Sequence, residues 1–215
     1  MIPLVVFSTG FAAKTKQKCI DSVNAQEGVK FTHVYLEASE QDPPKCMLQN
    51  LWEFVRTIPK ETIIVSLDGD DWFAHPHVLA KVLQMHQDGA WLTYGSYINS
   101  DGRPSFVKGP TPPHFRRVSW MTHLKTFRAG LFQRINQEDL MYQGKWRDRG
   151  PEVAYMVAMA EMAGVERMTY CPDVLVVYNY RDSFEMNASY SELAHEKHLV
   201  ATVRSGKPYE RIESL

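Results

Sequence analysis

Cysteine, net charge and long apolar runs are all scarce in this sequence. Three cysteines occur among its 215 residues and none forms a Cys-x-x-Cys pair, so a disulfide framework and a zinc site are both disfavoured. No apolar run approaches the roughly 20 residues of a membrane span, and the first residues lack the basic start of a signal peptide. A net charge of -1 argues against a general nucleic-acid or membrane-surface binder. We therefore expect a soluble, cytoplasmic protein with no membrane span and no nucleic-acid partner.

The sequence does contain enough apolar material for a sizeable buried core. Hydrophobic residues make up 44% and charged residues 23% of the chain, which is typical of a globular protein. No linker, internal repeat or low-complexity tract divides it, and its length suits one domain. We expect residues 1–215 to form a single domain.

Hydrophobic periodicity predicts alternating strands and helices in the first half of the chain. Short apolar runs predict strands at 3–7, 31–36, 63–67 and 91–98, and helical spacing predicts helices at 12–26, 47–58 and 78–86. Such alternation is typical of a mostly parallel central sheet with helices on both faces. The expected fold class is therefore α/β, with a Rossmann-like sheet.

The second half of the chain is predicted to continue this layering. Its patterns indicate helices at 124–135, 151–163 and 193–204, and strands at 168–170 and 174–179. The helix at 151–163 has the clearest ends, because Pro151 suits a first helical position and Gly164 a residue just past the end. Residues 103–118 are rich in proline and glycine, and we interpret them as a long loop that closes over a ligand.

The most informative stretch is the acidic turn, defined as Asp68-Gly69-Asp70-Asp71, which follows the apolar run 63–67. Open α/β sheets bind ligands at the carboxyl ends of their strands. Asp68 and Asp70, separated by one glycine, can face a single Mg²⁺ or Mn²⁺ whose remaining ligands are phosphate and water. The alternative is a solvated Asp-Gly turn. Crowding of three carboxylates favours the cation site, since a plain turn gains nothing from their repulsion.

Several ordered motifs together resemble glycosyltransferases of family 2, which have the GT-A fold. The stretch 19–26 resembles the first helix of that family, which typically closes on a Ser-Val-x-x-Gln pattern. The acidic turn resembles its Asp-x-Asp motif. Pro151-Glu152, a helix to Gly164 and then the run 171–178 resemble its Glu-Asp motif and last core strand. The resemblance spans nearly the whole chain.

The resemblance implies an inverting transfer of a sugar from a nucleotide-sugar, usually a UDP-sugar, to an acceptor hydroxyl, assisted by Mn²⁺ or Mg²⁺. It places Asp70 and Asp68 at the metal, with Asp68 also near the donor ribose beside Gly69. Glu37 and Thr9 would lie at the nucleobase and ribose, and Glu152 would be the catalytic base. Glutamate replaces the family's usual aspartate at 37 and 152. Asn179 stands where some members carry a metal-ligating histidine.

The chemistry of sugar transfer bears on three candidate residues. A carboxylate base must take the acceptor's proton, and the start of a helix favours the ionised form of Glu152. The alternatives are a first-turn glutamate that only stabilises its helix, or Asp148 as the base. Trp72 is a candidate platform for a sugar ring, against simple packing. His123 is a candidate acceptor-binding residue, although capping or packing is the plainer interpretation.

Two other functions stay open at this level. A catalytically inactive GT-A module would bind a nucleotide or glycan without turnover. A Mg²⁺-dependent nucleotidyltransferase would also use strand-end carboxylates, but the Ser8-Thr9-Gly10 segment is poor in the glycines that such enzymes carry after the first strand. The sequence does not identify the acceptor or the oligomeric state.

Overall fold

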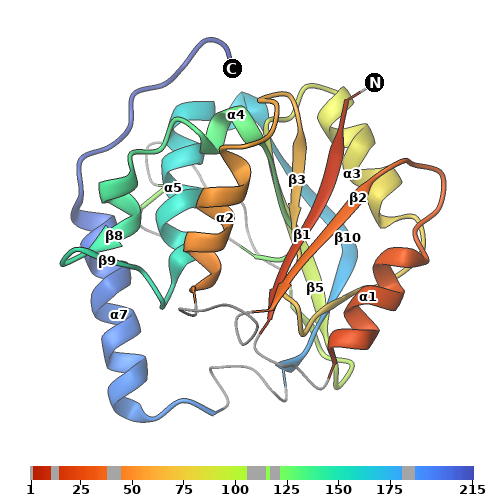
Figure 1. Ribbon diagram of the computed structural model, residues 1–215, viewed down its shortest axis with the longest axis horizontal. Coiled ribbons are helices and arrows are strands. Elements are labelled where there is room, and N and C mark those ends of the chain that lie inside the picture. Colours follow the sequence, from red (N-terminus) through yellow and green to blue (C-terminus); the bar gives the residue numbers. More distant parts are fainter. Residues whose placement is uncertain (1, 11–14, 38–44, 106–114, 117–121, 181–186) are drawn as a thin grey trace.

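The structure is a computed structural model that describes residues 2–10, 15–37, 45–105, 115–116, 122–180 and 187–215. Its centre is a curled eight-stranded sheet with the strand order β2-β1-β3-β7-β5-β10-β4, and β6 pairs with β5 at the side (Figure 1). The strands are β1 (Leu4–Gly10), β2 (Thr32–Glu37), β3 (Ile63–Ser66), β4 (Trp72–Phe73), β5 (Leu92–Asn99), β6 (Pro104–Ser105), β7 (Lys125–Arg128) and β10 (Met168–Tyr178).

Most of this sheet is parallel. Strands β2, β1, β3, β5 and β10 run in one direction, whereas β7, β6 and β4 run in the other. Strand β7 is inserted between β3 and β5, with Ser66 opposite Lys125 and Thr93 opposite Thr126. A second, two-stranded sheet pairs β8 (Met141–Tyr142) with β9 (Lys145–Trp146).

Helices cover both faces of the central sheet. One apolar cluster joins the sheet to α2 (Met47–Val55), α4 (Ala129–Phe132) and α5 (Pro151–Ala163), and the other joins it to α1 (Lys16–Asn24) and α3 (Val78–Gln87). Figure 1 shows α2 and α5 on one side of the sheet and α1 and α3 on the other. The α/β prediction, with a mostly parallel sheet covered on both faces, is confirmed. No helix within the described ranges is long and apolar enough to cross a membrane.

Two element predictions were wrong. The expected helix at 124–135 is strand β7 followed by the single turn α4, because Thr126 and Phe127 pair with strands on both sides and are fully buried there. The two strands expected at 168–179 form one strand, β10, whose register shifts between Cys171 and Val174 around Pro172. Most of the predicted closing loop at 103–118 lies outside the described residues.

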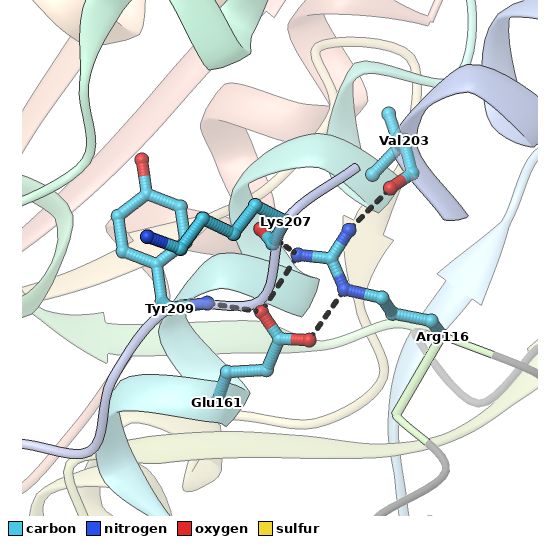
Figure 2. A network of polar contacts seen from close by, with 5 residues as sticks. All are labelled: Arg116, Glu161, Val203, Lys207 and Tyr209. Atoms are coloured by element: carbon cyan, nitrogen blue, oxygen red, sulfur yellow. Dashed lines mark hydrogen bonds and ion pairs between the residues drawn. The ribbon is translucent and has the colours of Figure 1, made fainter. Parts of the chain in front are cut away.

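The C-terminal segment packs back along α5. After α7 (Tyr190–Ser205), the backbone N–H of Tyr209 donates to Glu161 at 3.0 Å, and that of Ile212 donates to the Met162 carbonyl oxygen at 3.0 Å. Figure 2 shows the network at this junction, in which the guanidinium of Arg116 contacts both carboxylate oxygens of Glu161 and the carbonyl oxygens of Val203 and Lys207. One buried ion pair therefore joins the segment before β7 to α5, α7 and the C-terminal segment.

The carboxyl ends of the parallel strands meet at one edge of the sheet. Strands β1, β2 and β3 end there, at the lower side of Figure 1, and α5 also begins at the lower side. The acidic turn follows β3 directly, so the topology places it at the edge where ligands of open α/β sheets bind.

Candidate active site

The acidic turn is held against the end of β1. The backbone N–H of Gly69 donates to the Thr9 carbonyl oxygen at 2.8 Å, and the N–H of Asp71 donates to the Asp68 carbonyl oxygen at 3.0 Å. The contact is so close that a Cβ atom on Gly69 would lie 2.6 Å from the Thr9 oxygen and 2.6 Å from the Tyr35 hydroxyl. Glycine is therefore required at this position for steric reasons, beyond any general preference of turns.

The structure brings two carboxylates and one imidazole together behind this turn. The Nδ1 atom of His123 lies 3.8 Å from Oδ2 of Asp68 and 3.6 Å from Oδ2 of Asp71. One ligand-type atom from each of the three residues lies within 4.8 Å of the others. Asp68 was expected at the cation, whereas the participation of Asp71 was not predicted.

Asp71 is the most deeply buried member of this cluster. Its side chain is 0% exposed, and Oδ1 accepts the backbone N–H of Asn179 at 2.8 Å. Burial, followed by the charges of Asp68 and Asp70, raises the pKa of Asp71 well above its usual value. Its Oδ2 atom has no hydrogen-bond donor among the described residues.

His123 is held between aromatic rings. Its ring stacks on Tyr178 with centroids 5.0 Å apart and meets the edge of Tyr97 at 5.5 Å. Burial, followed by the charge of Lys125, lowers the pKa of His123 to about 3, so the imidazole is neutral. Nδ1 is buried and has no hydrogen-bond partner in the described part of the chain. A contact of His123 with an acceptor stays a prediction.

The cluster fits the divalent cation that the resemblance implies. Carboxylate oxygen and imidazole nitrogen are both ligands for cations such as Mn²⁺. A buried carboxylate oxygen beside an unpaired imidazole nitrogen is costly unless something compensates both. A cation between them would do so. Asn179, the position where some family members carry a ligating histidine, donates its side-chain amide to the Thr15 hydroxyl at 3.4 Å.

Lys125 places a buried positive charge beneath the carboxylates. It stands opposite Ser66 on β7 and is 5% exposed. Burial alone would lower the pKa of this ammonium group, but the charges of Asp68, Glu152 and Asp71 raise it overall. Lys125 is therefore charged, and it attracts the carboxylates of the acidic turn and of Glu152 electrostatically. Sequence motifs did not point to Lys125, because a single lysine inside an apolar stretch has no distinctive pattern.

Glu152 lies at the first turn of α5, as expected. Pro151 occupies the first helical turn, and Gly150 before it has the positive φ of 56°. Glu152 faces a cavity of about 430 Å³ between the start of α5 and α7. The other residues that line this cavity are Val153, Glu196, Lys197, Val200, Ala201 and Arg204. Asp148, the alternative base, lines a separate cavity between the β8–β9 hairpin and α7.

The remaining predicted residues lie around the same edge. Thr9, next to the last residue of β1, contacts the acidic turn through its carbonyl oxygen, as described above. Glu37, at the end of β2, forms an ion pair with Lys16, and its side chain is 11% exposed. The Nζ atom of Lys18 lies 3.5 Å from the centroid of the Trp72 ring, so an ammonium group covers one face of the proposed sugar platform. The roles of these residues toward a donor or an acceptor stay predictions.

Comparisons with known proteins bear on the fold. No protein-family profile and no curated protein matches the chain by sequence. Solved structures do match. Glucosyl-3-phosphoglycerate synthase from Mycobacterium tuberculosis, solved with Mn²⁺, UDP and phosphoglyceric acid, aligns with a TM-score of 0.59 at 12% identity over 96% of this chain and 80% of that one.

A second match is the 1–349 fragment of S. aureus TarS in complex with UDP-GlcNAc. It aligns with a TM-score of 0.57 at 12% identity, over 94% of this chain and 66% of that one. The same fragment in complex with UDP aligns with a TM-score of 0.55 at 11% identity. This chain thus spans about two thirds of the TarS fragment. The protein has the GT-A fold of these glycosyltransferases.

Proposed function

We propose that this protein is a metal-assisted glycosyltransferase that moves a sugar, with inversion, from a UDP-sugar to an acceptor hydroxyl on a glycan or another molecule. One observation carries the proposal. A carboxylate oxygen of Asp68, one of Asp71 and a ring nitrogen of His123 lie within 4.8 Å of one another at the ligand-binding edge of a GT-A fold. The choice of UDP is supported by the neighbouring structures, which were solved with UDP, UDP-GlcNAc or UDP and Mn²⁺.

The donor would lie across the ends of β1 and β2. We propose that Thr9 and Glu37 bind the nucleoside. Asp68 and Gly69 would bind the ribose and the part of the diphosphate that lies nearest the acidic turn. Asp68 and Asp70 are the proposed carboxylate ligands of the cation. When bound there, a divalent cation supplies Lewis-acid neutralisation of the negative charge that develops on the departing diphosphate.

The acceptor would approach from the α5 side. Glu152 would accept the proton of the acceptor hydroxyl while that oxygen forms a bond to the anomeric carbon of the donor sugar. The bond from the anomeric carbon to the phosphate oxygen breaks at the same time, and its electron pair leaves with UDP. The cavity between α5 and α7 has room for a sugar beside Glu152, with apolar contacts from Val153 and Val200. Trp72 is the proposed further contact of the acceptor.

A screen of donors tests the proposal directly. UDP-sugars should raise the melting temperature of the protein only in the presence of Mn²⁺ or Mg²⁺, and UDP should be released when a suitable acceptor hydroxyl is added. A matched set of GDP-, CMP- and ADP-sugars serves as the control. Equal stabilisation by all nucleotides, or none by any, would contradict the proposed donor.

A further inference from the structure

We propose that His123 is a direct ligand of the cation, that it acts together with Asp68 and Asp71, and that its nitrogen makes the site select Mn²⁺ over Mg²⁺. The inference rests on the proposed function, because it concerns the cation that the function requires. The motif in the acidic turn predicts only oxygen ligands. A nitrogen ligand is supplied by a residue from a different part of the chain, immediately before β7.

The distances fit coordination better than direct hydrogen bonding. At 3.6 Å and 3.8 Å, His123 Nδ1 is too far from the carboxylate oxygens of Asp71 and Asp68 to donate a hydrogen bond. Two ligand atoms that each lie about 2.1 Å from one cation are roughly 3 to 4.2 Å apart, depending on the angle between them. Both measured distances fall in that interval. The His123 nitrogen is therefore spaced from each carboxylate oxygen as two ligands of one ion are, and all three atoms lie within 4.8 Å of one another.

The unsatisfied atoms point to the same ion. Oδ2 of Asp71 belongs to a side chain with no solvent exposure, and neither it nor His123 Nδ1 has a hydrogen-bond partner among the described residues. Each of these buried atoms is costly without a partner. The second oxygen of Asp71 is fixed by the Asn179 backbone N–H, and the His123 ring is fixed by Tyr178. Both ligand atoms are thus oriented before any ion binds.

The ligand set also predicts which ion is preferred. Mg²⁺ favours oxygen ligands and keeps much of its water, whereas transition-metal ions gain more from an imidazole. A site with two carboxylates and one imidazole therefore favours Mn²⁺ over Mg²⁺. Without the imidazole, the site would keep only oxygen ligands and lose most of this preference.

The inference is tested with Mn²⁺ alone on the full chain. Pulsed electron paramagnetic resonance should show modulation from a directly bound ¹⁴N nucleus in the parent protein. The signal should disappear in His123→Phe, which keeps an aromatic ring between Tyr97 and Tyr178. It should remain in His77→Phe, a matched control at an exposed histidine. Because the parent alone gives the first result, the test does not depend on the folding of a variant.

Calorimetry gives the second measurement. Affinity for Mn²⁺ should fall at least about tenfold in His123→Phe, since even outer partners of metal ligands are worth about that much, while affinity for Mg²⁺ changes far less. Bound Mn²⁺ with no nitrogen modulation, or equal Mn²⁺ affinity in both proteins, would overturn the inference and leave the proposed function standing. Nitrogen-ligated Mn²⁺ in a protein that binds no nucleotide would support the inference and contradict the proposed function. A parent that binds no Mn²⁺ would overturn both.

Discussion

Gly69 donates its backbone N–H to the carbonyl oxygen of Thr9 at 2.8 Å, and this contact fixes the acidic turn to the end of β1. The two backbones approach so closely that no side chain fits between them. The position of Asp68 and Asp71 therefore depends on a residue that has no side chain of its own. A small steric change at Gly69 should act on the whole proposed cation site.

The substitution Gly69→Ala tests this dependence. Its Cβ would lie 2.6 Å from both the Thr9 oxygen and the Tyr35 hydroxyl, so the turn must move. Overpacking of this kind typically costs about 1–3 kcal/mol of stability, and we expect Mn²⁺-dependent UDP binding to weaken as well. Calorimetry and denaturant unfolding measure the two effects. The double variant Gly69→Ala/Tyr35→Phe should recover only part of the loss, because the Thr9 contact remains; full recovery would show that Thr9 is not the obstacle.

Asp70 is tested by Asp70→Asn, which keeps the side-chain volume and removes the charge. If Asp70 holds the cation with Asp68, affinity for UDP in the presence of Mn²⁺ should fall by at least about tenfold. The fold should survive, because this side chain is partly exposed. Asp88→Asn, at an exposed carboxylate after α3, is the control and should bind as the parent does. Parental affinity in Asp70→Asn would remove Asp70 from the set of ligands.

The network in Figure 2 predicts a large effect on stability far from the acidic turn. Arg116→Leu would leave the negative charge of Glu161 without its ion-pair partner, and the Glu161 side chain is only 9% exposed. Removing one partner of a buried ion pair typically costs about 3–5 kcal/mol of stability. The matched control is Arg211→Leu, because Arg211 pairs with Glu166 at an exposed site and such pairs are worth about 0–1 kcal/mol. Denaturant unfolding measures both variants. An equal loss of unfolding free energy in Arg116→Leu and Arg211→Leu would show that burial of the Arg116 pair does not matter.

His86 predicts a dependence of stability on pH. In the buried core, its Nδ1 contacts the Ala90 carbonyl oxygen at 2.9 Å and its Nε2 contacts the Thr126 hydroxyl at 2.7 Å. Burial, followed by the charge of Arg128, lowers the pKa of His86 to about 3. Below the ordinary value of about 6.5, the unfolded chain takes up a proton that the folded protein refuses.

The free energy of unfolding should therefore fall by up to about 1.4 kcal/mol for each pH unit below 6.5 on account of this residue. His86→Gln should be less stable at pH 7 but should lose less stability between pH 6.5 and 4.5. Urea unfolding at several pH values measures the slope. His75→Gln, at an exposed histidine, should keep the parental slope. An unchanged slope in His86→Gln would contradict the assignment.

Much of the fold follows from local patterns in the sequence. The strand that leads into the acidic turn and the helix that begins at Pro151 could be predicted, because apolar runs and turn residues mark both ends of each. Strand β7 could not. Its residues 125–128 have a pattern compatible with a helix, and only the pairing with β3 and β5, which lie far apart in the chain, makes them a strand.

The candidate site divides in the same way. Asp68 and Glu152 could be chosen from motifs because each stands beside a structural signal, the glycine turn or the helix start. Asp71 and His123 could not be paired, since their contact depends on the insertion of β7 beside β3. Lys125 could not be predicted for a related reason. The role of a charged residue in an apolar stretch can be inferred only when its buried neighbours are known.

The exchange of Glu152 for glutamine tests the central claim most directly. A general base typically contributes about 10²–10⁴-fold to the rate, so Glu152→Gln should reduce sugar transfer by about that factor. Affinity for the UDP-sugar should stay within about threefold of the parent, a difference below ~1 kcal/mol, because the donor is held at the acidic turn. Asp148→Asn is the matched control and should transfer sugar at the parental rate. If instead Glu152→Gln transfers sugar at the parental rate and loses only a few tenths of a kcal/mol in stability, Glu152 is not the base and the account is wrong at its centre.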